Sequence, residues 1–556
     1  MEHSSMRAPW RGQLSAAGVI IGCIGCVIIT ASSVYTALKM GALPWPTIFT
    51  SITSLVVLRA LGRNSLNEAN VTQIIMSAGS MVAGGLAFTI PGIWMLGLDN
   101  QVGWPEMLAV ALAGTLLGLV CTALIRRRFI EDSGLEYPIG TAAAETLMAS
   151  RAGGATGKRL FGSMAFAGAW CVLRDVLRVI PSMLFALPIP GVSFGIYNSP
   201  MLLSVGFLVG GGAVAFWFAG AVLANFGIIV GGSGLGLIDV ATAQGIVSSL
   251  GMGLMMGSGI GVVVRDILPK AGRFLRARHG DARAAGRRLG QLDAGVLALL
   301  TAGAALIVCF GIGLGAIGCV VVVLLAFVTT IMSAQSVGQT GIDPMEIFGL
   351  IVLLVIAALG EADQVKLFYV AGVVAVACGL AGDVMSDFKT GSLIGTDPRA
   401  MWVGQALGAL LGTVVSVAVM AALLSAYGAD AFGPGKLFVS AQASVVATMV
   451  SGVPSLGAFI IGLLGGTALY CVGIPSMMIG LGVYLPFYMS FSATLGACVK
   501  FAFDRLSARR ENRGDADGQE TTDEETGIII ASGVLGGESI VGVILALVAV
   551  VGGLIG

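Results

Sequence analysis

Charged residues and histidine are scarce in this sequence. Only 11% of its 556 residues are Asp, Glu, Lys or Arg, and its two histidines are His3 and His279. A soluble domain carries roughly 25% charged residues, so an ordinary soluble protein is excluded. So few histidines argue against a triad enzyme or a histidine-based metal centre. Because the formal net charge is zero, overall charge gives no indication of a nucleic-acid partner.

Complete nucleotide-binding and nucleophile motifs are also lacking. Residues 153–158 resemble a P-loop, but the first glycine is one position off and Arg159 replaces Ser/Thr. Residues 191–195 fit G-x-S-x-G without the strand–turn–helix context or a histidine. The nine cysteines are scattered, and the one close pair, Cys23 and Cys26, lies in an apolar run that favours packing. We therefore predict no enzyme activity, no metal and no cofactor, so that active transport would use an ion gradient or a separate subunit.

Apolar runs and glycine are abundant. Hydrophobic residues make up 56% of the chain, and apolar runs long enough to cross a bilayer recur along it. This pattern predicts an all-α polytopic membrane protein with about 14 to 17 membrane segments, one of them covering residues 161–187. The 83 glycines suit close helix packing and broken or re-entrant helices.

Basic residues indicate the orientation and the domain boundaries. Arg59 and Arg63 fall on the same side as the N-terminal arginines, which predicts a cytoplasmic N-terminus, and the run at 14–38 is too long for a cleaved signal. The expected parts are a first membrane half (1–265), a basic cytoplasmic linker (266–290), a second half (291–503), a charged flexible loop (504–526) and a C-terminal membrane segment (527–556). The two halves share a layout of paired helices, a polar interruption and a broken segment, which suggests internal repeats.

A first polar cluster occupies residues 65–73, directly before an apolar run. Polar groups are costly there unless they line a cavity or bind something. The amides of Asn67, Asn70 and Gln73 suit peptide bonds, carboxylates or chelates. Glu68 could couple transport to protons if its ionisation changed with access to either side. The alternative is a cytoplasmic loop with a helix N-cap.

A second polar cluster, at residues 383–391, brings both charge signs together. Asp383 and Asp387 are four residues apart and share one face of a helix. Lys389 could neutralise one of them or hold a substrate carboxylate. The alternative is a loop with surface charges.

A short apolar segment at 135–150 has basic residues at both ends, which predicts a re-entrant half-helix. It carries Tyr137, Thr141 and Glu145. An acid in such a place is a candidate site residue. Alternatively, Glu145 is a structural partner of Arg174 or Arg178. The spacings of Arg174, Asp175 and Arg178 also allow these three residues to pair within one helix.

The residues 65–79, S-L-N-E-A-N-V-T-Q-I-I-M-S-A-G, resemble the signature of the oligopeptide transporter family, which includes the yellow-stripe-like metal–chelate transporters. Segments 87–92, 135–145, 382–391, 451–455 and 475–486 resemble its later motifs in matching order, so that the similarity runs from about residue 12 to 502. Asp383 and Ser386 depart from the expected pattern, because amide-type residues are expected there.

The resemblance implies a proton-coupled symporter that imports short oligopeptides or peptide-like metal chelates, with no cofactor. The basic central loop and the composition rich in Gly, Ala and Arg suggest a protein of a bacterial inner membrane. Whether it forms a homodimer is left open. One unit would rock or slide against the other around a midplane site. The substrate-binding candidates are Asn67, Asn70, Gln73, Tyr137, Thr141, Asp387, Lys389 and Tyr484, the last closing the pocket. The proton-coupling candidates are Glu68, Glu145 and Asp383.

Two other functions compete with this interpretation. A channel would need a continuous polar stripe, whereas polarity here is clustered at breaks. A polytopic membrane enzyme would need a catalytic constellation, which the motifs above do not supply.

Overall fold

The computed structural model describes residues 10–265, 294–450, 455–511 and 526–538, apart from short gaps at 41–42, 44–45, 153, 263, 342, 434–435, 439, 532 and 536, with single residues described up to 552. The fold is helical, with a single two-stranded sheet among these residues. Eight of the described helices are long and apolar enough to cross a membrane, and five shorter apolar helices accompany them. The predicted all-α, multi-pass class is confirmed, while the total of 14 to 17 segments stays a prediction.

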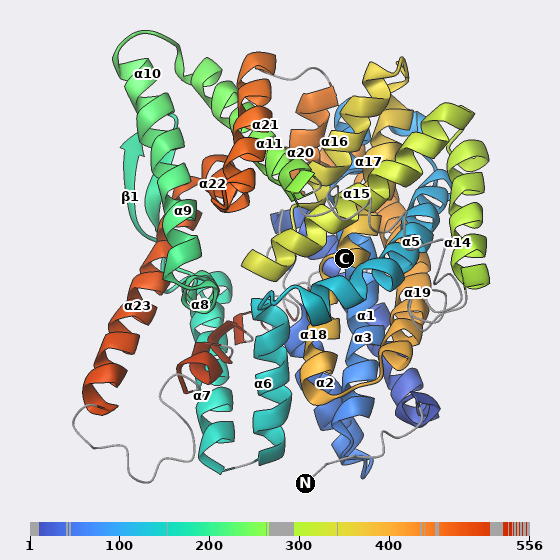
Figure 1. Cartoon of the computed structure of the whole chain (residues 1–556), viewed down its shortest axis with the longest axis vertical. Coiled ribbons are helices and arrows are strands. Elements are labelled where there is room, and N and C mark those ends of the chain that lie inside the picture. The colour runs from blue at the N-terminus through green and yellow to red at the C-terminus, as the bar shows by residue number, and fades with distance from the viewer. Residues whose placement is uncertain are drawn as a thin grey trace. The chain divides into compact units, whose positions relative to one another are not determined.

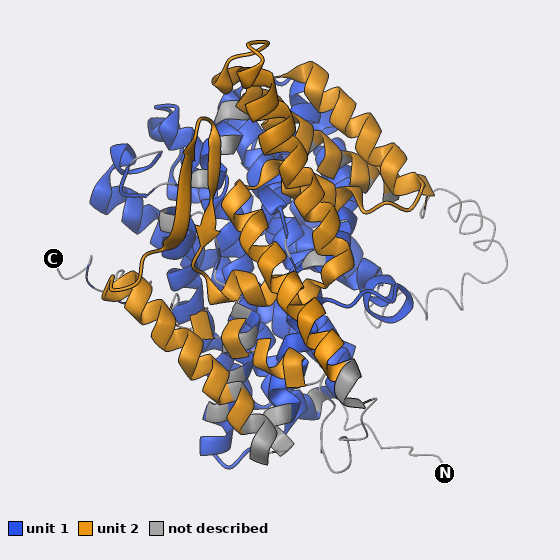
Figure 2. Ribbon diagram, turned by 90° about the vertical axis from the view of Figure 1, so that its left-hand side faces the viewer, with its two compact units in different colours: residues 1–148, 277–451, 542–556 blue, residues 149–276, 452–541 orange. Residues whose placement is uncertain are grey.

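The chain forms two compact units, each drawn from separate stretches of sequence (Figure 2). Unit 1 comprises residues 1–148, 277–451 and 542–556, and unit 2 comprises residues 149–276 and 452–541. The predicted membrane halves are defined by a repeated layout in the sequence, whereas the two units are defined by contacts between residues. The units therefore do not test the halves, which stay predictions. The linker at 266–290 lies outside the described residues.

The elements of unit 1 are helical (Figure 1). They are η1 (Trp10–Gln13), α1 (Ala16–Met40), α2 (Pro46–Ala60), α3 (Leu66–Ala87), α4 (Pro91–Met95), η2 (Asp99–Gln101), α5 (Trp104–Arg127), η3 (Arg128–Asp132), α6 (Pro138–Ala152, in this unit to residue 148), α14 (Ala294–Leu306), η7 (Ile307–Gly311), α15 (Ala316–Thr340), α16 (Met345–Ala358), α17 (Gln364–Ala381), α18 (Val384–Ile394), α19 (Pro398–Tyr427), η8 (Ala429–Ala431) and α20 (Ala441–Val450).

Helices α3 and α17 form the core of unit 1. Nearly every residue of both helices is buried, as expected for helices that other helices surround. Helices α1, α2 and α19 pack on α3, while α5, α15 and α16 pack on α17, and α3 and α17 touch each other. Small residues let the backbones approach. A Cβ atom on Gly412 of α19 would collide with the backbone of Gly79 on α3.

Unit 2 contains the hairpin as well as helices. Its elements are α7 (Gly154–Cys171), η4 (Val172–Val176), β1 (Met183–Ile189), β2 (Val192–Tyr197), α8 (Pro200–Val209), α9 (Gly211–Val222), η5 (Leu223–Val230), α10 (Gly231–Gly234), α11 (Val240–Val262), α21 (Leu456–Cys471), α22 (Ser476–Tyr484) and α23 (Phe487–Glu511), and helical residues continue from 526.

The hairpin β1–β2 corrects the prediction that residues 161–187 form one spanning helix. Helix α7 ends at Cys171, and antiparallel strands follow with Ile189 opposite Val192. The two residues between them, Pro190 and Gly191, suit a tight turn because Gly191 has φ +78°. Apolar composition alone does not distinguish such a strand from a buried helix.

Helix α23 extends into the segment expected to be a charged loop. Residues 504–511 are helical, and residues 512–525 lie outside the described part of the chain. Arg, Leu, Ala and Glu in this stretch have good helix propensity, and Lys500 pairs with Asp504 one turn later, at 3.3 Å.

Candidate functional site

The first polar cluster forms the beginning of helix α3. Ser65 is its N-cap, and its hydroxyl accepts a hydrogen bond from the Glu68 backbone N–H at 3.3 Å. From Leu66 to Gln73 only Asn67 is not buried. The cluster therefore projects into the core of unit 1 rather than forming a cytoplasmic loop.

Asp387 connects the two polar clusters. Gln73 Nε2 donates to Asp387 Oδ1 at 2.5 Å, and Ser77 Oγ donates to Oδ2 at 2.6 Å. Thr47 of α2 also donates to this carboxylate. Asp387, Gln73 and Ser77 are completely buried. Among the residues that the structure describes, no basic side chain forms a salt bridge with Asp387.

Two amide oxygens on α3 have no hydrogen-bond partner among the described residues. They are Asn70 Oδ1 and Gln73 Oε1, and both side chains are completely buried. Because these residues are three apart on one helix, they share a face. A buried acceptor without a donor costs roughly 1–3 kcal/mol. The site therefore has unused capacity to accept hydrogen bonds.

Thr396 joins the two predicted asparagines. Asn70 Nδ2 donates to Thr396 Oγ1 at 3.3 Å, and Thr396 Oγ1 donates to Asn67 Oδ1 at 3.2 Å. Thr396 is missing from the sequence prediction. Its signal is its place in the Gly395-Thr-Asp397-Pro turn, where Gly395 has φ +86° and Asp397 caps α19.

Tyr137, Thr141 and Lys389 make contacts to backbone groups. Tyr137 is fully buried with φ +48°, and its hydroxyl donates to the Ala334 carbonyl at 3.0 Å. Thr141 Oγ1 donates to the Glu136 carbonyl at 2.6 Å, and Lys389 Nζ donates to the Leu135 carbonyl at 3.0 Å. The structure thus brings these three residues to one segment, while their roles in ligand binding stay predictions.

Asp383 lies at the junction of α17 and α18, beside a second acid that the sequence prediction missed. A Cβ atom on Gly382 would overlap the Ser333 hydroxyl, and that hydroxyl donates to Asp343 Oδ2 at 2.7 Å. Asp343 Oδ1 is buried and has no partner in the part of the chain that the structure describes. The available signal for Asp343, and for buried Glu346 after it, is two acids directly before the apolar run 347–359.

The remaining predicted residues are Glu68, Glu145 and Tyr484. Glu68 is buried and forms a 2.7 Å salt bridge with Arg63, and the Ser15 hydroxyl donates to it. Glu145 is half-buried on α6. Tyr484 ends α22 and belongs to unit 2, whereas the other predicted residues belong to unit 1.

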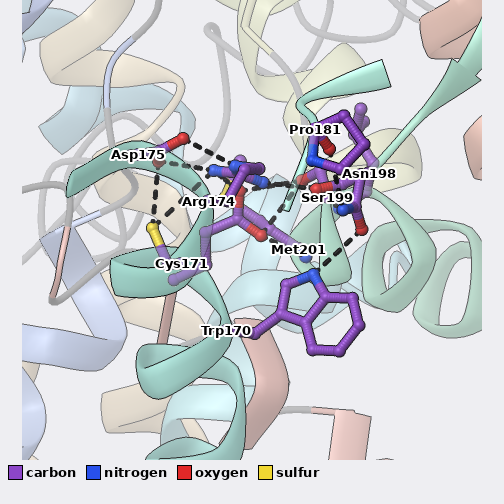
Figure 3. Close-up of polar contacts among 10 residues, drawn as sticks. Trp170, Cys171, Arg174, Asp175, Pro181, Asn198, Ser199 and Met201 are labelled. Atoms are coloured by element: carbon purple, nitrogen blue, oxygen red, sulfur yellow. Dashed lines mark hydrogen bonds and ion pairs between the residues drawn. The ribbon is translucent and has the colours of Figure 1, made fainter. Parts of the chain in front are cut away.

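Unit 2 has its own buried charge network around Arg174 (Figure 3). Arg174 forms salt bridges with neighbouring Asp175 at 2.7 Å and with Glu538 at 2.8 Å, and Nη1 donates to the Asn198 carbonyl at 2.6 Å. Glu538 Oε2 also accepts from the Met201 backbone N–H at 2.8 Å, at the beginning of α8. This arrangement pairs the buried charges, so the network holds the C-terminal segment within its unit.

Comparison with known proteins agrees with these features. The family profile described as OPT oligopeptide transporter protein matches residues 13–244 and 275–549. A candidate oligopeptide transporter of Haemophilus influenzae is 24% identical over 92% of this chain and 92% of its own length. Metal-nicotianamine transporters YSL2 of Oryza sativa and of Arabidopsis thaliana are 37% and 42% identical, each over 17% of this chain and 15% and 14% of their own lengths. The matched family comprises transporters rather than enzymes, and the chain belongs to the oligopeptide transporter family.

Proposed function

We propose that this protein is a proton-coupled symporter that imports short oligopeptides or peptide-like metal chelates across a bacterial inner membrane. The N-terminus and the linker 266–290 would face the cytoplasm. The family match and the names of the similar proteins support this class of cargo. Peptides and metal–nicotianamine complexes share amine and carboxylate groups, so one site of amides and hydroxyls suits both.

The observation that carries the proposal is the pair of unpartnered oxygens, Asn70 Oδ1 and Gln73 Oε1. Cargo N–H groups would supply the donors that these acceptors lack, and the cost of leaving them buried would then be relieved. A site of this kind rejects a ligand that lacks the matching N–H groups. The proposed cargo is therefore recognised by its N–H groups.

The cargo site is tested by uptake into proteoliposomes under an imposed pH gradient, with a labelled tripeptide and an iron–nicotianamine chelate as competing cargoes. Asn70→Leu is expected to raise the KM by about tenfold, which corresponds to about 1.4 kcal/mol, because one acceptor is lost. Asn225→Leu is the control, because Asn225 is also buried but donates to the Ala221 carbonyl of its own helix turn. An unchanged KM in Asn70→Leu, or flux that does not saturate, would count against the proposed site.

The role predicted for Glu68 is tested separately. If Glu68 carries the coupling proton, Glu68→Gln is expected to lose accumulation under a pH gradient and to keep exchange of cargo at equal pH. Arg63→Gln is the matched control, because it breaks the same salt bridge but leaves the carboxyl group in place. An equal loss of accumulation in the two variants would show that only the salt bridge matters.

A further inference from the structure

We propose that Asp387 is the group that binds and releases the coupling proton, and that Ser77 is a positioning residue that lets it do so without losing a hydrogen bond. This inference rests on the proposed proton-coupled function. It differs from the sequence prediction, which placed Asp387 among the substrate-binding residues.

Asp387 only accepts hydrogen bonds from the residues that the structure describes, which is the pattern of an ionised carboxylate. Its carboxylate accepts from Gln73 Nε2 at 2.5 Å, from Ser77 Oγ at 2.6 Å and from the Thr47 hydroxyl, and all of these side chains are buried. The donors are neutral. Ion pairing would stabilise the charged form strongly, whereas neutral donors do so less, so both charge states of such a group remain accessible.

Ser77 can accommodate the protonated state because its hydroxyl has a second acceptor. The Ile74 carbonyl lies 3.3 Å from Ser77 Oγ. A serine hydroxyl has one proton and two lone pairs. When a proton binds Asp387 Oδ2, the new O–H donates to Ser77 Oγ, and the Ser77 proton turns to the Ile74 carbonyl. Gln73 Nε2 continues to donate to Oδ1, so one proton enters and one hydrogen bond reverses direction.

Other ionisable groups near α18 are engaged elsewhere or are acids. Lys389 donates to the Leu135 carbonyl, Glu68 of α3 pairs with Arg63, and Arg399 of α19 is exposed. Asp383 precedes Asp387 by one helix turn, and Asp343, beside α15, is bound by Ser333 and followed by Glu346. The acids of η3, Glu131 and Asp132, are exposed.

Unpartnered Gln73 Oε1 links this proton site to the cargo. The amide that holds Asp387 through Nε2 carries the oxygen that lacks a donor. A cargo N–H that binds Oε1 would polarise the same amide and strengthen its bond to Asp387. Gln73 therefore connects cargo binding to the charge state of the carboxyl group.

The test uses full-length protein in proteoliposomes with the labelled tripeptide and the iron–nicotianamine chelate, in sodium-free choline buffer. Asp387→Asn mimics the protonated acid and keeps a donor and an acceptor, so the fold is retained. It is expected to lose at least about tenfold in accumulation under a pH gradient while tripeptide or chelate exchange at equal pH persists.

Ser77 is tested by the pH profile of uptake. Ser77→Ala is expected to shift the midpoint of that profile, and Ser77→Thr, which restores the hydroxyl, is expected to return it. Ser80→Ala is the control, because buried Ser80 lies one turn further along α3 and donates to the Ser77 carbonyl at 2.6 Å. A profile that moves equally in Ser77→Ala and Ser80→Ala would overturn the role of Ser77.

The outcomes separate this inference from the proposed function. A wild type that responds to the pH gradient, together with an Asp387→Asn variant that keeps full coupling, overturns the inference alone. A wild type that ignores the pH gradient, or that accumulates cargo only under a sodium gradient, overturns the proposed function and the inference with it.

Discussion

Replacing Arg174 with methionine is expected to lower the free energy of unfolding by roughly 3–5 kcal/mol, the range found when one partner of a buried ion pair is removed. The substitution leaves the carboxylates of Asp175 and Glu538 without their cation, and the side chain of Glu538 is only 8% exposed. It also removes the donor to the Asn198 carbonyl. Methionine fills a similar volume, so the loss measures the charge network.

Thermal unfolding in detergent measures this effect. Arg178→Met is the control, because Arg178 lies one turn later in the sequence and is exposed. Combining Arg174→Met with Glu538→Gln should recover part of the loss, since the uncompensated charge is removed. Equal melting temperatures for Arg174→Met and Arg178→Met would show that the network contributes nothing to stability.

Replacing Gly412 with valine is expected to prevent the close packing of α19 on α3 and to abolish most of the folded yield. The added Cβ atom would collide with the Gly79 backbone, which cannot move aside as a flexible side chain can. Overpacking a core typically costs about 1–3 kcal/mol, and a backbone collision at a helix crossing belongs at the upper end or beyond. Because α3 carries Asn70, Gln73 and Ser77, the polar site would be displaced as well.

Size-exclusion chromatography of the detergent-solubilised protein measures the folded yield. Gly295→Val is the matched control, because Gly295 is in helix α14 of the same unit and nothing lies within 4 Å of an added Cβ atom. Similar monodisperse yields for the two variants would contradict the importance of the α3–α19 crossing.

The polar clusters were identifiable in the sequence because the bilayer makes polar residues conspicuous. Asn70, Gln73 and Asp387 stand out against apolar surroundings. In the structure Gln73 donates to Asp387, and Asn70, on the same face of α3, donates to Thr396. Ser77 was not identifiable, because serine is common in membrane helices and bonds to backbone carbonyls there. Thr396 was missed although it lies in a recognisable turn before α19. Their roles depend on partners that are distant in the sequence.

The errors have a similar cause. Most of strand β1 was predicted as the end of a helix over residues 161–187, because its residues are nearly all apolar and hydropathy does not distinguish the two states. Lys389 was expected to neutralise an acid or to hold a substrate carboxylate. It donates to the Leu135 carbonyl in the structure, and its role in substrate binding stays a prediction. Arg174 pairs with Asp175 of its own helix, which the sequence allowed, and also with Glu538, a partner that the sequence did not indicate because it is far along the chain.

The sequence by itself determined that the chain is a multi-pass helical membrane protein and a member of its family, because hydropathy and local motifs are properties of short stretches. Only the tertiary structure decided which polar atoms meet and which remain unpartnered. Gln73 and Asp387 are 314 positions apart, and Ser77 and Asp387 are 310 apart. Their hydrogen bonds follow from how α3 and α18 pack, and such packing depends on glycine contacts and side-chain shapes along whole helices.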